Sequence, residues 1–246
     1  SCYLAAECFR YASTHDEEAK KNARNTLYGI NWLQDVTGIK GLLARGCTKY
    51  KAERGHEEWH RSTVNSSWWW RGDVSVDQVC GVMYGYSAYY DLVANESEKK
   101  VIANYVGNMW NRIIDNDMQI IDIDGEMTTF GQYSPKTIEG KGRSLFSLSH
   151  LKAAYHMTGD KKFQQKYKEL IEKHSQYWAL LASDIGLPPI KIIRDFGKIV
   201  PDSHLKGKLS LLYNTILGGG LVPFAYAGTS NHNMAFLAYY PLLRYE

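Results

Sequence analysis

The chain repeats a unit of two helices joined by a short turn, and this repetition limits its possible folds more than any other feature. The first unit predicts helices over residues 3–13 and from Glu17 to about Gln34, separated by the turn Thr14–Asp16. Apolar residues recur in the second helix at spacings of three and four, as in an amphipathic helix. Glu17 and Glu18 favour the start of that helix, because carboxylates stabilise the positive end of the helix dipole.

Two further copies of the unit follow. The second predicts helices over residues 74–93 and 96–114, and the third predicts helices over 144–157 and from the Thr158–Asp160 turn to about Leu181. The turns are unequally spaced, whereas solenoid repeats keep a fixed period. Another helix near 203–217 and the first helix of a further pair, Asn233 to Tyr245, continue the pattern. We therefore predict an all-α fold, a toroid of helical hairpins that forms one domain over residues 1–246.

Long loops of unusual composition separate the pairs. Residues 46–72 are polar and basic and then rich in tryptophan, and residues 218–233 are rich in glycine. Within the loop 116–143, the alternating stretch Ile120–Glu126 has Asp-Gly at its centre, which predicts a short β-hairpin and only minor β-structure near 118–130. Functional residues concentrate on long loops of a rigid scaffold, so we expect the functional residues of this chain in these loops.

Three consecutive tryptophans run into two aspartates, Asp73 and Asp77, at the predicted start of a helix near Val74. Aromatic rings stack on apolar surfaces, and carboxylates bind hydroxyl groups and transfer protons to a glycosidic bond. The cluster predicts a carbohydrate site whose substrate-binding residues are Trp68, Trp69, Trp70 and Arg71. The same residues have a structural alternative, in which the tryptophans belong to the core and Asp73 caps the helix.

Glycoside hydrolysis needs two carboxyl groups on opposite sides of the scissile bond, roughly 5–9.5 Å apart. Asp73 and Asp77 are the candidate catalytic carboxylates on one side. The hairpin supplies the candidates for the opposite side, namely Asp122, Asp124 and Glu126, although the same residues are also typical of a tight turn. The hairpin acids lack the rest of a calcium-binding loop, and no metal site is predicted.

Four residues in other loops complete the predicted site. His232 would bind a sugar or act as a base in an elimination, with Asn231 beside it, and the alternative for both is a role at a helix start. Tyr133 as a proton donor and Arg143 as the partner of a uronate carboxylate would fit a polysaccharide lyase or a uronic-acid hydrolase, and the alternative for both is a structural role.

The composition excludes several other classes of protein. A net charge of +3 is too small to predict nucleic-acid binding. No apolar run reaches the roughly 18 residues of a membrane span. The four cysteines form no CxxC pair, and the chain has no aspartate-rich DDxxD run, which argues against a zinc-dependent or prenyl-processing enzyme. No cofactor is predicted.

Several segments together resemble a known superfamily. They are the turns Thr14–Asp16 and Thr158–Asp160, the stretch Thr37–Arg45, the helix entry Arg71–Asp77, the acidic stretch Asp122–Glu126 and the stretch Asn231–Phe236. In these segments the chain resembles the six-hairpin glycosidase superfamily, the (α/α)6 toroids that include many glycoside hydrolases and some polysaccharide lyases. A full toroid has twelve helices, whereas about eight are predicted here, so the ring is incomplete or a piece of a larger barrel.

The resemblance implies a carbohydrate-active enzyme, a glycoside hydrolase with carboxylate acid/base chemistry in an aromatic-lined groove. It implies an oligosaccharide or polysaccharide substrate, no cofactor, no nucleic-acid or membrane partner, and a periplasmic or extracellular location. Two alternatives from the same fold are a polysaccharide lyase and a non-catalytic glycan-binding or scaffold protein. Two carboxylates facing each other across a groove would distinguish the enzyme from the binding protein.

Overall fold

The computed structural model describes residues 1–50, 58–137, 143–174, 234 and 236–245. Its described part is mainly helical, with two small antiparallel sheets. The labelled helices are α1 (Cys2–Thr14), α2 (Glu17–Asp35), α3 (Val76–Leu92), α4 (Glu96–Asp115), α6 (Ser144–Thr158) and α7 (Lys161–His174). These bounds confirm the three predicted helical pairs. Residues 236–244 near the C-terminal end are also helical, which agrees with the helix predicted from Asn233 to Tyr245. The helix predicted near 203–217, the loop 218–233 and the third pair beyond residue 174 lie outside the described residues.

Local hydrogen bonds explain why the chain turns between α1 and α2. The Thr14 hydroxyl donates to the Arg10 carbonyl at 2.7 Å, and the Asp16 amide donates to the Thr14 hydroxyl at 3.3 Å. Asp16 Oδ1 then accepts from the Glu18 amide at 2.9 Å, which caps the start of α2. Between them, His15 adopts a left-handed conformation with φ 56°.

The turn between α6 and α7 repeats this arrangement. The Thr158 hydroxyl donates to the Ala154 carbonyl at 2.6 Å, and the Asp160 amide donates to the Thr158 hydroxyl at 3.1 Å. Asp160 Oδ1 accepts from the Lys162 amide at 2.9 Å, and the middle residue, Gly159, is again left-handed with φ 70°. A Thr-X-Asp sequence therefore builds the same turn twice, which is the local origin of the repeated hairpin.

In the second hairpin, both helices begin with a capping box instead of the Thr-X-Asp turn. Asn95 and Glu98 form a reciprocal capping box at the start of α4, with bonds of 2.9 and 3.0 Å. At the start of α3, Gln78 Oε1 accepts from the Ser75 amide at 2.8 Å, so Ser75 is the cap. The predicted helix start near Val74 and the alternative of capping by Asp73 are both wrong, because this box begins α3 at Val76.

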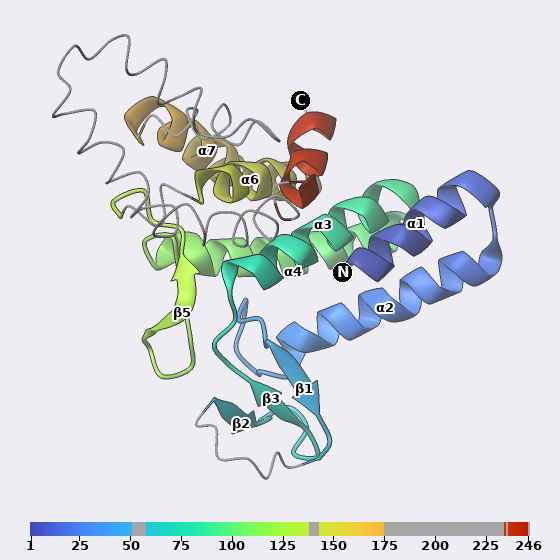
Figure 1. The fold of residues 1–246 in the computed structure, drawn as a ribbon, viewed down its shortest axis with the longest axis horizontal. Coiled ribbons are helices and arrows are strands. Elements are labelled where there is room, and N and C mark those ends of the chain that lie inside the picture. The colour runs from blue at the N-terminus through green and yellow to red at the C-terminus, as the bar shows by residue number, and fades with distance from the viewer. Residues whose placement is uncertain (51–57, 138–142, 175–233, 235, 246) are drawn as a thin grey trace, which may run out of the picture.

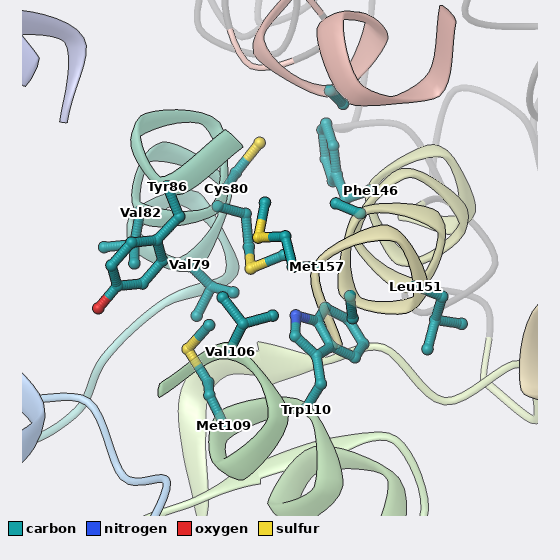
Figure 2. Packing of buried hydrophobic residues seen from close by; sticks show 14 of the residues in the cluster. Val79, Cys80, Val82, Tyr86, Val106, Met109, Trp110, Phe146, Leu151 and Met157 are labelled. Carbon is teal, nitrogen blue, oxygen red and sulfur yellow. The ribbon is translucent and has the colours of Figure 1, made fainter. Parts of the chain in front are cut away.

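The hairpins pack on one another in chain order. Helix α1 contacts α2 and α3, while α6 contacts α3, α4 and α7. Figure 2 shows Val79 of α3, Val106 of α4 and Met157 of α6 meeting in one core. Buried residues occur around most of α3 and α6, which places these two helices inside the bundle. None of the helices in the described part of the chain is long and apolar enough to cross a bilayer.

Two small sheets lie beside the bundle (Figure 1). Strands β4 (Gln119–Ile121) and β5 (Met127–Gln132) form an antiparallel hairpin, as predicted. Strands β1 (Gly46–Thr48), β2 (Trp59–Arg61) and β3 (Trp69–Arg71) form a second antiparallel sheet in the order β1-β3-β2. The interpretation of residues 46–72 as a loop is wrong at these strands. Three-residue strands are too short to show the alternation that identifies a strand in a sequence.

Candidate functional site

The sheet β1-β3-β2 has two different faces, because successive side chains of a strand point to opposite sides. On the inner face, Trp70 pairs with Cys47 and His60 in the register and packs against a small core that includes Val36 and Leu42. Trp70 is 1% exposed, and its ring centroid lies 4.7 Å from that of His60. The prediction that Trp70 binds a substrate is therefore wrong, since its ring is held in the core.

The opposite side of this sheet carries six residues in two rows of three. The rows are Thr48, Trp69 and Arg61, and Gly46, Arg71 and Trp59. We call these six residues the outer face. Neighbours within a row have Cβ atoms about 4.5–5.5 Å apart, and the two rows are about 7 Å apart along the strands. The outer face therefore brings two tryptophans and two arginines within the span of a short oligomeric ligand.

The outer face is accessible at several points. Trp59 and Trp69 are half-buried, and Arg61 is exposed. A Cβ atom built on Gly46 would meet no other atom within 4 Å, so the position beside Arg71 is open. The neighbouring Trp68 is also half-buried, with its ring edge against Trp32 at 5.5 Å between centroids. Of the three consecutive tryptophans, Trp69 is the one that this register assigns to an accessible sheet face.

The two arginines of the outer face differ in their charge partners. Arg71 Nε lies 2.6 Å from Glu58 Oε2, in an ion pair that links β3 to the residue before β2. Arg61 Nε donates to the Ser66 carbonyl at 2.9 Å, and Arg61 has no carboxylate partner among the residues that the structure describes. A carbonyl dipole leaves the formal charge of a guanidinium in place, so Arg61 carries the uncompensated charge of this face.

Asp73 joins this sheet to the β4–β5 hairpin. Its Oδ1 accepts from the Thr129 amide at 2.7 Å, and its Oδ2 lies 3.2 Å from Arg45 Nη1. The Asp73 amide donates to Asp122 Oδ2 at 2.6 Å, and Asp73 is left-handed with φ 52°. Aspartate tolerates this conformation better than most residues. Both carboxylate oxygens of Asp73 therefore hold the junction between the two sheets together.

Of the three hairpin acids predicted to lie opposite Asp73, the structure brings Asp122 to it, through the Asp73 amide. Asp124 and Glu126 are exposed at the hairpin turn, where Asp124 Oδ1 accepts from the Glu126 amide at 2.9 Å. This contact matches the alternative in which the acidic stretch forms a turn.

Glycine at position 72 allows the close approach of Asp122. A Cβ atom on Gly72 would lie 2.5 Å from Asp122 Oδ2, whereas a Cβ atom on Gly46 would meet nothing. We expect Gly72→Ala to break the Asp122 contact and to lower the free energy of unfolding by about 1–3 kcal/mol, because the Asp73 amide loses its partner. Gly46→Ala is the matched control and should be close to neutral. Urea denaturation of both variants measures the difference, and equal stabilities would contradict this role of Gly72.

Asp77 remains available for chemistry. It is exposed in the first turn of α3 and makes no hydrogen bond or ion pair with the described residues. Burial is the main cause that raises the pKa of Tyr133, and the negative charge of Asp77 raises it further. Among the predicted catalytic carboxylates in the described part of the chain, those of Asp77 and Glu126 make no hydrogen bond or ion pair, and Asp77 is the one at the start of α3.

Tyr133 lies in the core, contrary to the prediction that it binds a substrate. It is 0% exposed, and its ring packs against Trp110 at 5.4 Å and His150 at 6.3 Å between centroids. Arg143 Nη1 donates to the Phe130 carbonyl at 3.0 Å and to the Gln132 carbonyl at 3.2 Å, so it supports the end of β5. Asn231 and His232 lie outside the described residues.

His150, for which the sequence predicted no role, is the most deeply enclosed histidine that the structure describes. It is 1% exposed, and neither ring nitrogen has a hydrogen-bond partner among the residues that the structure describes. Burial lowers the pKa of His150 to about 3. Its position inside the helix predicted over 144–157 gave no signal of this, because periodicity identifies a helix face and not the partners of a polar atom.

Comparisons of the chain with protein-family models, with curated proteins and with solved structures find no match.

Proposed function

We propose that the protein binds a carbohydrate chain on its outer face, and that its helical hairpins form an arc of an (α/α) toroid. The observation that carries this proposal is the pair of half-buried tryptophans, Trp59 and Trp69, on one sheet face beside Arg61, Arg71 and Thr48. Indole rings supply flat apolar surfaces for the C–H faces of sugars. Guanidinium and hydroxyl groups beside them supply hydrogen bonds to sugar oxygens.

The arrangement suits an extended ligand better than a single sugar. Trp69 and Trp59 are diagonal neighbours across adjacent strands, a relation that separates side-chain origins by about 7–8 Å. Two rings at this spacing can contact successive units of one chain. Binding is the activity that the described residues support best, because the carboxylates of Asp73 and Asp122 both accept hydrogen bonds from backbone amides.

We expect Trp69→Ala to weaken glycan binding with little change in folding. A stacked aromatic contact contributes about 0.5–1.5 kcal/mol beyond the area that it buries, which corresponds to at least a 2- to 12-fold loss of affinity. Calorimetric titration with a panel of oligosaccharides measures this loss. The control is Tyr50→Ala, which removes an aromatic ring that is 83% exposed just after β1 and is not on the outer face. Equal affinities of Trp69→Ala and the unchanged protein would remove the outer face from the proposal.

Hydrolysis of the bound glycan is a second candidate function. Asp77 favours it, because this exposed carboxylate at the start of α3 makes no hydrogen bond or ion pair with the described residues. It would act as the base that activates water, and a second carboxyl group would have to protonate the leaving group. The release of reducing ends from a glycan that binds the protein supports hydrolysis, and binding without release supports the non-catalytic function.

A further inference from the structure

The outer face carries a positive charge next to one of its two half-buried tryptophans. Arg61 lies directly opposite Trp69 in the register, on the adjacent strand β2. We infer that the glycan bound by the outer face is anionic, with carboxylate or sulfate groups on its sugars, and that Arg61 selects for this charge. The inference rests on the proposed function and names the class of glycan that this site takes.

The one hydrogen bond that the Arg61 side chain makes with the described residues leaves the two terminal nitrogens of its guanidinium available to a ligand. Its Nε donates to the Ser66 carbonyl at 2.9 Å, which fixes the plane of the guanidinium, and its terminal nitrogens make no hydrogen bond within the described part of the chain. A guanidinium presents paired N–H groups that match the two oxygens of a carboxylate or sulfate. Because the side chain is already oriented, less conformational entropy is lost when an anion binds.

Arg71 provides an internal contrast on the same face. Its Nε pairs with Glu58 at 2.6 Å, so its charge is already compensated. A second positive group lies near the sheet, since Lys49 Nζ stands 5.4 Å from the centre of the Trp68 ring. Trp68 packs against the inner core, so Lys49 does not belong to the outer face, and Arg61 is the uncompensated positive charge of that face among the described residues.

The same arrangement opposes a neutral glycan. A neutral sugar stacked on Trp69 would remove water from Arg61 without supplying an opposite charge, and burying an unpaired charge is unfavourable. Specificity of this kind comes from the penalty on the wrong ligand as much as from contacts with the right one. The open position at Gly46 leaves room beside Arg71 for a substituent on the sugar ring.

The test compares ligands that differ in charge. The unchanged protein is titrated with an oligogalacturonate, its neutral methyl ester, a sulfated oligosaccharide and a single-stranded oligonucleotide, at low and high salt. We expect at least tenfold tighter binding of the oligogalacturonate or the sulfated oligosaccharide than of the neutral ester, and weaker binding at high salt. The preferred anion identifies carboxylate or sulfate as the recognised group. A stronger preference for the oligonucleotide would overturn the inference in favour of a nucleic-acid ligand.

Variants of single charges complete the test. Arg61→Gln should weaken binding of the anionic glycan by about tenfold or more, since charged hydrogen bonds are the stronger ones. Binding of the neutral ester should not weaken and should become tighter, because no unpaired charge is then desolvated. Lys161→Gln removes the same charge from the exposed start of α7, on the far side of the bundle from the sheet (Figure 1), and should have little effect. Equal binding of charged and neutral glycans, or equal effects of the two variants, would overturn the inference and leave glycan binding intact. Failure of every glycan to bind would overturn both.

Discussion

Lowering the pH from about 7 to 4.5 should destabilise the protein by about 3 kcal/mol through His150 alone. The ordinary pKa of histidine is 6.5, and burial lowers that of His150 to about 3 in the folded protein. Between these values the unfolded chain binds a proton that the folded protein excludes, so stability falls as the pH falls. Each pH unit in this window contributes about 1.4 kcal/mol. Above pH 6.5 both states are neutral at His150, and the effect vanishes.

The variant His150→Phe separates this effect from the titration of carboxylates. It keeps an aromatic ring beside Trp110 and removes two buried nitrogens that have no partner. We therefore expect the variant to be at least as stable as the unchanged protein at pH 7. At pH 4.5 the free energy of unfolding of the variant should exceed that of the unchanged protein by about 3 kcal/mol more than at pH 7. The control is His15→Asn, an exposed position where asparagine suits the left-handed backbone. Urea denaturation at several pH values gives the comparison, and parallel pH profiles for His150→Phe and the unchanged protein would contradict this role.

Trp70→Ala should cost about 3–5 kcal/mol of stability, the usual range for removing a large buried aromatic side chain. Trp70 is 1% exposed and fills the core under the sheet, between the sheet and the end of α2. The adjacent Trp69→Ala should cost much less, because Trp69 is half-buried on the outer face. Two neighbouring tryptophans are thus expected to have opposite roles, one in folding and one in binding.

Urea denaturation of both variants, followed by circular dichroism, measures this contrast. The helical signal of Trp69→Ala should unfold at nearly the same urea concentration as that of the unchanged protein, and Trp70→Ala should unfold well below it. Equal midpoints for Trp69→Ala and Trp70→Ala would contradict the assignment of the two rings to opposite faces of the sheet.

The helical hairpins could be predicted from the sequence because their causes are local. The threonine and aspartate of Thr14–Asp16 and Thr158–Asp160 each bond to backbone groups within four residues, so a short motif contains the whole turn. The β4–β5 hairpin could also be predicted, because Asp-Gly at its centre is a local turn signal. Helix α3 begins two residues later than predicted, because the capping box of Ser75 and Gln78 sets its first residue.

The site was harder to predict because its geometry depends on contacts between distant segments. Whether Trp69 or Trp70 faces outward is decided by the pairing of β3 with β1 and β2, which three-residue strands do not reveal. The sequence offered three acids of the hairpin as partners of Asp73, and only the fold, which joins segments 49 residues apart, selects Asp122 among them. The buried state of Tyr133 also depends on packing between α4, α6 and the end of β5.

The most direct test of the central claim is a titration of the unchanged protein and Trp69→Ala with an oligogalacturonate, followed by tryptophan fluorescence and calorimetry. The proposed glycan-binding function predicts saturable binding by the unchanged protein and a loss of affinity of at least 2- to 12-fold in Trp69→Ala, with its folding intact. Arg61→Gln should show a comparable or larger loss in the same titration. Saturable binding that is unaffected by Trp69→Ala would contradict the account, because the ligand would then bind away from the outer face.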